Sequence, residues 1–263
     1  MTDTSHPYAG RFVWYDLMTT DQVAAQKFYT SIAGWGTDEW DMEGTPYRMW
    51  TVDGTSIGGM MQLPADQVAN NAPPHWLGYI GTPDVAATVA AATSLGATVL
   101  MPPTPIPTVG TFAILTDPYS ATFAVFTPEG ETPGRSGAPS PGDFSWCELA
   151  TTDIDGALEF YGALFGWTKD SDMDMGSDGI YRMFARDGVM MGGMYNISPK
   201  MPIAMSPSWT FYIFVPDIHE AAARVTAGGG TILVPPQPIP GGIIIMANDP
   251  QGGLFAAHAM SDS

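Results

Sequence analysis

The chain has 263 residues, 45% of them hydrophobic, which is enough for one large or two ordinary domains with sizeable cores. Nine basic residues stand against 27 acidic ones, and the net charge of −18 argues against nucleic acid and anionic membranes as partners. The single cysteine excludes an internal disulfide and a thiolate metal cluster.

The first ten residues lack the charged and apolar regions of a secretory signal, so we expect a cytoplasmic protein. A β-rich run over 12–18 predicts the first strand. Asp21 follows at the N-cap position of a helix, where its carboxylate can accept hydrogen bonds from the first backbone amides. Gly34 supplies the end of this helix.

The first half of the chain contains the same pattern of one strand, one helix and three strands twice. After the first helix, three strands are predicted near residues 38–43, 46–53 and 56–63. The second round has a strand at 75–81, a helix between Asp84 and Leu95, and strands near 97–101, 110–116 and 121–127. The Pro-rich segment PPTPIP (102–107) reads as a stiff loop.

The second half of the chain repeats the first. FVWYDLMTTDQVAAQKFYTSIAGW (12–35) and FSWCELATTDIDGALEFYGALFGW (144–167) are identical at 11 of 24 positions. IGGMM, PPTPIP and TDPYSATFAVF recur as MGGMY, PPQPIP and NDPQGGLFAAH. We therefore predict a domain at 1–130, a Pro-, Gly- and Ser-rich linker at 131–142, and a second domain at 143–263.

These motifs, in this order and twice, resemble the tandem glyoxalase-like branch of the vicinal-oxygen-chelate (glyoxalase/bleomycin-resistance/dioxygenase) superfamily. The resemblance implies an α+β fold in which two βαβββ modules form a half-barrel with a cleft in each domain. It leaves the function open, because that superfamily includes lyases, dioxygenases, epimerases and drug-binding proteins.

The resemblance also implies three metal-ligand positions in each domain, which members usually fill with His, Glu or Gln. In this sequence they hold Trp14, Leu77 and Ala124 in the first domain, and Trp146, Thr210 and Ala256 in the second. A divalent metal needs about three converging N, O or S donors. We therefore expect no metal and no other cofactor.

Strand alternation places Trp14 and Asp16 on one face of the first strand, and Trp146 and Glu148 on the matching face in the second domain. By the resemblance, this face lines the cleft. A carboxylate beside aromatic surface suits general acid or base catalysis, so Asp16 and Glu148 are candidate catalytic residues. In the alternatives, Arg48 and Arg182 or backbone amides anchor these carboxylates structurally, or the carboxylates are simply exposed to solvent.

His258 is a third candidate catalytic residue, because it follows Ala256 by two positions and should face the second cleft, with Glu148 across from it. The first domain has Phe126 at this place. The alternative is a surface histidine near the end of the chain. Candidate ligand-binding residues recur in pairs, although shared packing would explain the repetition as well: Trp14 and Trp146, Tyr47 and Tyr181, Arg48 and Arg182, Tyr79 and Tyr212.

Two main functions follow from these observations. The favoured one is binding of a small, mainly apolar or aromatic molecule in a cleft rich in Met and Trp, by a monomer or homodimer. The alternative is a metal-independent lyase, isomerase or hydrolase that uses Glu148 or His258 as acid or base. A metal-dependent glyoxalase or dioxygenase is the least favoured.

Overall fold

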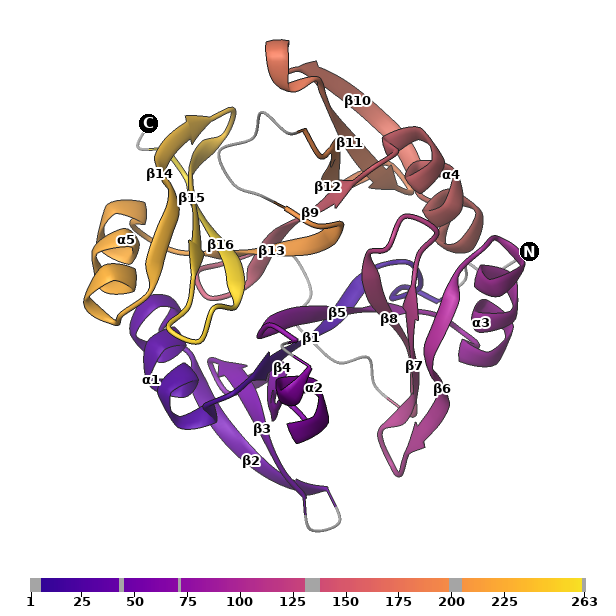
Figure 1. Ribbon diagram of the computed structural model, residues 1–263, viewed down its shortest axis with the longest axis horizontal. Coiled ribbons are helices and arrows are strands. Elements are labelled where there is room, and N and C mark those ends of the chain that lie inside the picture. The colour runs from indigo at the N-terminus through magenta and orange to yellow at the C-terminus, as the bar shows by residue number, and fades with distance from the viewer. Residues whose placement is uncertain (1–5, 43–44, 71, 131–137, 199–204, 262–263) are drawn as a thin grey trace. The chain divides into compact units, whose positions relative to one another are not determined.

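The structure is a computed structural model that describes residues 6–42, 45–70, 72–130, 138–198 and 205–261 (Figure 1). In the first half the elements are β1 (Phe12–Thr19), α1 (Gln22–Ala33), β2 (Gly36–Met42), β3 (Thr45–Val52), β4 (Thr55–Gln62), α2 (Ala65–Ala69), β5 (His75–Gly81), α3 (Val85–Ser94), β6 (Thr98–Ile106), β7 (Gly110–Thr116) and β8 (Thr122–Pro128). In the second half they are β9 (Phe144–Thr151), α4 (Ile154–Phe165), β10 (Thr168–Asp174), η1 (Gly176–Asp178), β11 (Ile180–Arg186), β12 (Val189–Asn196), β13 (Ser208–Phe214), α5 (Ile218–Ala227), β14 (Thr231–Ile239), β15 (Gly242–Asn248) and β16 (Leu254–Ala259).

The strands form two eight-stranded sheets, one from each half of the sequence. Their orders are β2-β3-β4-β1-β5-β8-β7-β6 and β10-β11-β12-β9-β13-β16-β15-β14. In each module the first strand pairs in parallel with the last one, as β1 does with β4 and β9 with β12. The predicted α+β fold with two βαβββ modules in each half is therefore confirmed.

The first helix of each half begins and ends as its sequence predicts. Asp21 caps α1 by accepting hydrogen bonds from the amides of the second and third residues after it, and Asp153 caps α4 in the same way. Gly34 and Gly166 close these helices in the left-handed conformation, with φ values of 72° and 73°. The repeated sequence thus produces the same helix geometry twice.

The prediction of a loop for the PPTPIP segment is wrong, because its residues up to Ile106 belong to β6. Thr104 pairs with Phe112 and Pro105 with Thr111, next to shifts in the strand register. β6 is the last strand of its sheet. An edge strand tolerates proline, which has no N–H group to donate to a neighbouring strand.

The chain packs into two compact units whose membership differs from the two sequence halves. Unit 1 contains residues 1–13, 77–133 and 147–209, and unit 2 contains 14–76, 134–146 and 210–263. Each unit therefore combines one module of the first half with one of the second. Within unit 1, α3 packs against α4, and within unit 2, α1 packs against α5 (Figure 1). The predicted linker lies partly outside the described residues, at 131–137.

A buried chain of hydrogen bonds links the two modules of unit 2. The indole N–H of Trp76 donates to the Tyr29 hydroxyl over 3.0 Å, and this hydroxyl donates to Asp249 Oδ2 over 3.0 Å. Asp249 Oδ1 accepts the backbone amides of Gln251 and Gly253. Tyr29, Trp76 and Asp249 therefore meet in the core of unit 2, although Tyr29 and Asp249 are 220 residues apart in the sequence.

Unit 1 contains the same arrangement built from the equivalent residues. Trp209 Nε1 donates to the Tyr161 hydroxyl over 3.1 Å, and Tyr161 donates to Asp117 Oδ2 over 3.0 Å. The backbone amides of Tyr119 and Ala121 donate to Asp117 Oδ1. Burial raises the pKa of both Asp117 and Asp249, and raises that of both tyrosines further from neutrality.

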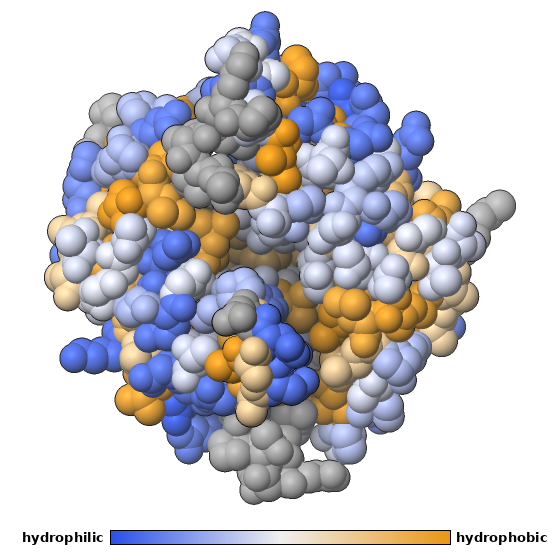
Figure 2. Space-filling view, viewed as in Figure 1, coloured by the Kyte–Doolittle hydropathy of each residue, from blue (hydrophilic) through white to orange (hydrophobic). Residues whose placement is uncertain are grey.

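The surface of unit 1 carries an apolar patch in the region of β6 and β7, orange in the right half of Figure 2. Three consecutive residues of β6 contribute exposed side chains to it: Val99, Leu100 and Met101. No helix in the described part of the chain is long and apolar enough to cross a membrane.

Candidate functional site

The first candidate site is one face of the sheet formed by β1, β3 and β4 in unit 2. We call Trp14, Asp16, Met18, Tyr47 and Met61 the first acid–tyrosine face. Asp16 lies opposite Gly59 and Met18 opposite Met61 in the parallel pairing of β1 with β4. The alternating neighbours along these strands, such as Leu17 and Trp50, point to the other side and are buried.

Asp16, Tyr47 and Trp14 form a closed triangle of hydrogen bonds. The Tyr47 hydroxyl donates to Asp16 Oδ1 over 2.6 Å. The Trp14 indole N–H lies 2.7 Å from the Tyr47 oxygen and 3.1 Å from Asp16 Oδ1, and donates to both. Only 4% of the Asp16 surface is exposed, and this buried carboxylate accepts hydrogen bonds from Tyr47 and Trp14 on the same face of the sheet.

The GG motif leaves room for this triangle at Gly59 and for the neighbouring strand at Gly58. A Cβ atom on Gly59 would lie 1.8 Å from the Tyr47 hydroxyl oxygen, and one on Gly58 would lie 2.3 Å from the carbonyl oxygen of Tyr15. Any side chain at Gly59 would therefore displace Tyr47 from Asp16. Glycine within a strand commonly marks such a close approach of another group.

The second candidate site is the equivalent sheet face in unit 1. We call Glu148, Met173, Tyr181, Met183 and Tyr195 the second acid–tyrosine face. Tyr181 lies opposite both Met173 and Tyr195 in the antiparallel pairing, and Glu148 lies opposite Gly193. All five side chains are half-exposed, in contrast to the buried residues on the other side of these strands.

The Tyr181 hydroxyl donates a hydrogen bond of 2.7 Å to Glu148 Oε1. The rings of Tyr181 and Tyr195 are stacked, with centroids 6.3 Å apart and planes inclined by 17°. Burial, and next the negative charge of Glu148, raise the pKa of Tyr195, whose hydroxyl donates to Met205 Sδ over 3.4 Å. Tyr195 is thus a neutral hydrogen-bonding aromatic group beside a carboxylate.

Two of the differences between the faces concern the carboxylate and the residue beside the tyrosine. Asp16 is replaced by the longer Glu148, which is half-exposed where Asp16 is buried. Met61 is replaced by Tyr195, so that the second face has two tyrosines where the first has one. The second face therefore offers a more accessible carboxylate and a second tyrosine, and both of its tyrosines are half-exposed.

The structure does not bring Arg48 to Asp16 or Arg182 to Glu148, so the predicted arginine anchors are wrong. Arg48 pairs with Glu39 over 2.7 Å. Arg182 pairs with Asp172 over 2.9 Å and also with Asp155 of α4. Each arginine follows its tyrosine directly, so strand alternation turns it to the opposite side of the sheet.

His258 lies in unit 2 on β16, opposite Phe214 of β13. Its ring stacks on Phe214 with centroids 5.6 Å apart, and its Nδ1 lies 3.4 Å from Ser145 Oγ. Burial lowers the pKa of His258, which favours a neutral imidazole. These contacts lie within unit 2, whereas the Glu148–Tyr181 hydrogen bond lies within unit 1.

The remaining predicted ligand-binding residues lie on the central strands. Tyr79 is buried on β5, with its ring centroid 6.1 Å from that of Phe112. Tyr212 is buried on β13 opposite Ala256. Trp146 is half-buried on β9, and its neighbour Cys147 is buried.

The residues at the six implied metal positions do not fit a divalent metal. Leu77, Ala124 and Ala256 have no donor atom in their side chains, and an indole nitrogen such as that of Trp14 donates a hydrogen bond rather than an electron pair. Thr210 supplies one buried hydroxyl, which has no hydrogen-bond partner in the structure. Among the described residues, no three His, Cys, Asp or Glu side chains converge as a metal site would require.

The sequence model of the Glyoxalase/Bleomycin resistance protein/Dioxygenase superfamily matches residues 11–125 and 143–256. The chain belongs to this superfamily. The protein named "Putative glyoxylase CFP32" of Mycobacterium bovis is 34% identical over 246 residues, which cover 92% of each chain. The anthracycline biosynthesis protein DnrV of Streptomyces peucetius is 27% identical and covers 94% of this chain and 92% of its own.

Solved structures of the superfamily share the fold at low sequence identity. The Mn(II)-bound glyoxalase from Novosphingobium aromaticivorans matches with a TM-score of 0.65 at 13% identity, covering 96% of this chain and 82% of that one. The 2,3-dioxygenase LapB from Pseudomonas sp. KL28 matches with a TM-score of 0.63 at 11% identity, covering 96% and 92%. The tandem glyoxalase-like architecture is thereby confirmed.

Sequence reasoning missed three features of the two faces. Tyr195 was not selected, although its replacement of Met61 between the repeats is visible in the sequence. Met205 contacts Tyr195 from outside the repeated motifs, and nothing in its own segment signals this. The sequence gives no sign that the hydroxyl of Thr210 is buried without a hydrogen-bond partner.

Proposed function

We propose that this chain binds a small, mainly apolar or aromatic molecule on the second acid–tyrosine face, without a divalent metal. The observation that carries the proposal is the half-exposure of Met173, Tyr181, Met183 and Tyr195 together. Contiguous apolar and aromatic surface of this kind usually marks a binding site. Glu148 gives the face one charged hydrogen-bonding group that can orient the ligand.

Two relatives support an aromatic ligand by their names. The proteins DnrV and DauV are described by their part in anthracycline biosynthesis, and anthracyclines are polycyclic aromatic compounds. Flexible methionine side chains adapt to such flat ligands. The residues at the metal positions support binding without a metal, because they supply no ligand set.

The proposal is tested with N-phenyl-1-naphthylamine, a neutral fluorescent aromatic probe, titrated into protein dialysed against EDTA. We expect binding that Tyr195→Ala and Met183→Ala each weaken by about tenfold, as expected for side chains at the centre of a binding surface. Met49→Ala makes the matched change in the first half and should leave the affinity unchanged. Binding that requires added metal, or an equal loss in Met49→Ala, would contradict the proposal.

A second candidate function is metal-independent acid–base catalysis by Glu148. It is supported by the 2.7 Å hydrogen bond between Glu148 and Tyr181, which is a route for proton transfer to a bound ligand. Its test is turnover of bound ligands by the wild type and by Glu148→Gln. Turnover that disappears while binding persists would establish catalysis, and His258→Gln shows whether the neutral imidazole takes part.

A metal-dependent glyoxalase or dioxygenase reaction is the least favoured function. The named glyoxalase neighbour is Mn(II)-bound, but its 13% identity carries only the fold. Elemental analysis of the purified protein decides the matter. Stoichiometric manganese, iron, nickel or zinc would contradict the metal-free proposal.

A further inference from the structure

The second acid–tyrosine face carries a negative charge and no positive one among its described residues. Glu148 is its acidic member, and the other four members are two methionines and two tyrosines. The nearest basic residues along these strands, Lys169 and Arg182, lie opposite Phe184 and Asp172 in the strand pairing, on the side that packs against α4. Both are paired with Asp172 there. An anionic ligand would therefore meet repulsion on this face without compensation.

The two tyrosines add a second attraction for positive charge. Aromatic ring faces attract cations, and quaternary ammonium groups are recognised by cages of such rings. The Tyr181 and Tyr195 rings are nearly parallel, with an interplanar angle of 17°, and Tyr181 is hydrogen-bonded to the carboxylate. The two rings and the carboxylate thus lie next to one another on the same side of the sheet.

We infer that the ligand of the second acid–tyrosine face is a cation, namely a protonated alkylamine that carries an aromatic group or an aromatic quaternary ammonium compound. Its positive group would lie beside Glu148 and the tyrosine rings, and its aromatic part on Met173 and Met183. The net charge of −18 favours the approach of such a ligand from a distance. This inference rests on the proposed function, because it specifies the chemistry of the molecule bound there.

The first acid–tyrosine face differs in both parts of this arrangement. Asp16 is 4% exposed, and its Oδ1 accepts hydrogen bonds from Tyr47 and Trp14. Met61 stands where the second face has Tyr195. Cation recognition is therefore expected on the second face and not on the first.

The test measures how well each of three competitors of similar size displaces N-phenyl-1-naphthylamine from the full-length protein: phenyltrimethylammonium, tert-butylbenzene and benzenesulfonate. We expect the cation to bind about tenfold or more tightly than its neutral isostere, and the anion not to compete. Raising the salt concentration should weaken the binding of the cation alone.

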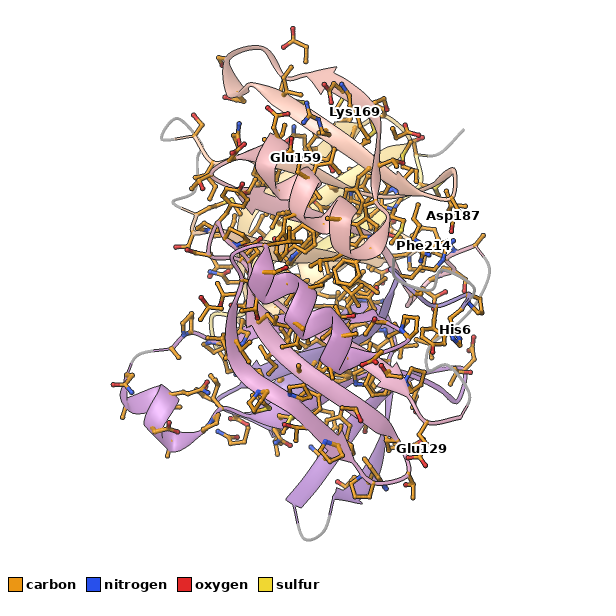
Figure 3. All side chains as sticks on the ribbon, turned by 90° about the vertical axis from the view of Figure 1, so that its right-hand side faces the viewer. His6, Glu129, Glu159, Lys169, Asp187 and Phe214 are labelled. Carbon is orange, nitrogen blue, oxygen red and sulfur yellow. The ribbon has the colours of Figure 1, made fainter. Side chains whose placement is uncertain are left out.

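Three variants show which residues are responsible for the preference for the cation over its neutral isostere. Glu148→Gln should bring the cation and the neutral isostere to within about threefold of each other, because the charge is removed while the shape is kept. Tyr195→Met, which introduces the residue of the first repeat, should reduce the preference several-fold. Glu159→Gln is the matched control: it makes the same chemical change on an exposed residue of α4 in the same unit (Figure 3), and should leave the preference unchanged.

The outcomes separate this inference from the proposed function. If the fluorescent probe binds and Tyr195→Ala weakens it, but all three competitors act equally, the cation inference is overturned and the proposed function stands. An equal change in Glu148→Gln and Glu159→Gln also overturns it, because bulk charge would then suffice. If the fluorescent probe does not bind at all, the proposed function and this inference both fail. The salt dependence in the wild type keeps the test decisive should a variant not fold.

Discussion

Tyr161→Phe removes a single oxygen atom from the core of unit 1 and should destabilise the protein strongly. Tyr161 is completely buried, and its ring stacks on Trp167 with centroids 5.1 Å apart. Phenylalanine keeps that ring and its packing. What is lost is the hydroxyl that accepts from Trp209 and donates to Asp117.

The size of the effect follows from the two groups left behind. The indole N–H of Trp209 and Oδ2 of Asp117 are both buried, and an unsatisfied buried donor or acceptor costs about 1–3 kcal/mol. A loss of about 3 kcal/mol in the free energy of unfolding is therefore expected, and on the order of 6–12 °C in Tm for a domain-sized unit. Tyr29→Phe breaks the equivalent chain in unit 2 and should cost about the same.

Equilibrium unfolding in urea, followed by tryptophan fluorescence, measures this loss. Tyr8→Phe is the control for removing a hydroxyl from a half-buried ring, and should change the unfolding free energy by less than about 0.5 kcal/mol. A loss below about 1 kcal/mol in both Tyr161→Phe and Tyr29→Phe would refute the idea that these hydrogen bonds hold the modules of each unit together.

Three further predictions follow from the geometry. Gly193→Ala places a Cβ atom 2.1 Å from the Tyr181 ring, so it should lower the free energy of unfolding in urea by about 1–3 kcal/mol. It should also weaken binding of the fluorescent probe, and unchanged binding would contradict the proposal that Tyr181 contacts the ligand. Asp21→Ala removes the N-cap of α1 and should cost about 1 kcal/mol in thermal unfolding, with no effect on probe affinity. Burial raises the pKa of Asp117 above its ordinary 3.8, so its stabilising contribution is present below that pH and is lost as the pH rises through the native pKa. The unfolding free energy of the wild type should therefore fall relative to that of Asp117→Asn as the pH rises above 3.8, and a constant difference would show that Asp117 is not perturbed.

Much of the local structure could be predicted because it depends on local sequence. The N-cap aspartates, the helix-ending glycines and the alternating strand faces act over a few residues, and Asp21, Gly34 and Trp14 behave as their sequence positions indicate. The GG motif could be interpreted for the same reason, since only a residue without a side chain leaves room for Tyr47.

The pairing of modules could not be predicted from the repeats. Self-similarity shows which segments are alike, but it does not show which of them pack together. Tyr29 meets Asp249 rather than the equivalent Asp117 of its own half, and no local pattern distinguishes these two aspartates. The arginine anchors failed for a simpler reason, because the expectation paired opposite charges by type and ignored the face to which Arg48 points.

Each unit combines one module from each half of the chain, and this arrangement affects how the two halves can diverge in sequence. If the two halves were separate identical chains, the same contacts would build a symmetric homodimer with two identical units, and every substitution would appear in both. Joining the halves into one polypeptide removes that constraint. The two carboxylate faces can then diverge independently, so that Asp16 is buried in one unit while Glu148 is half-exposed in the other.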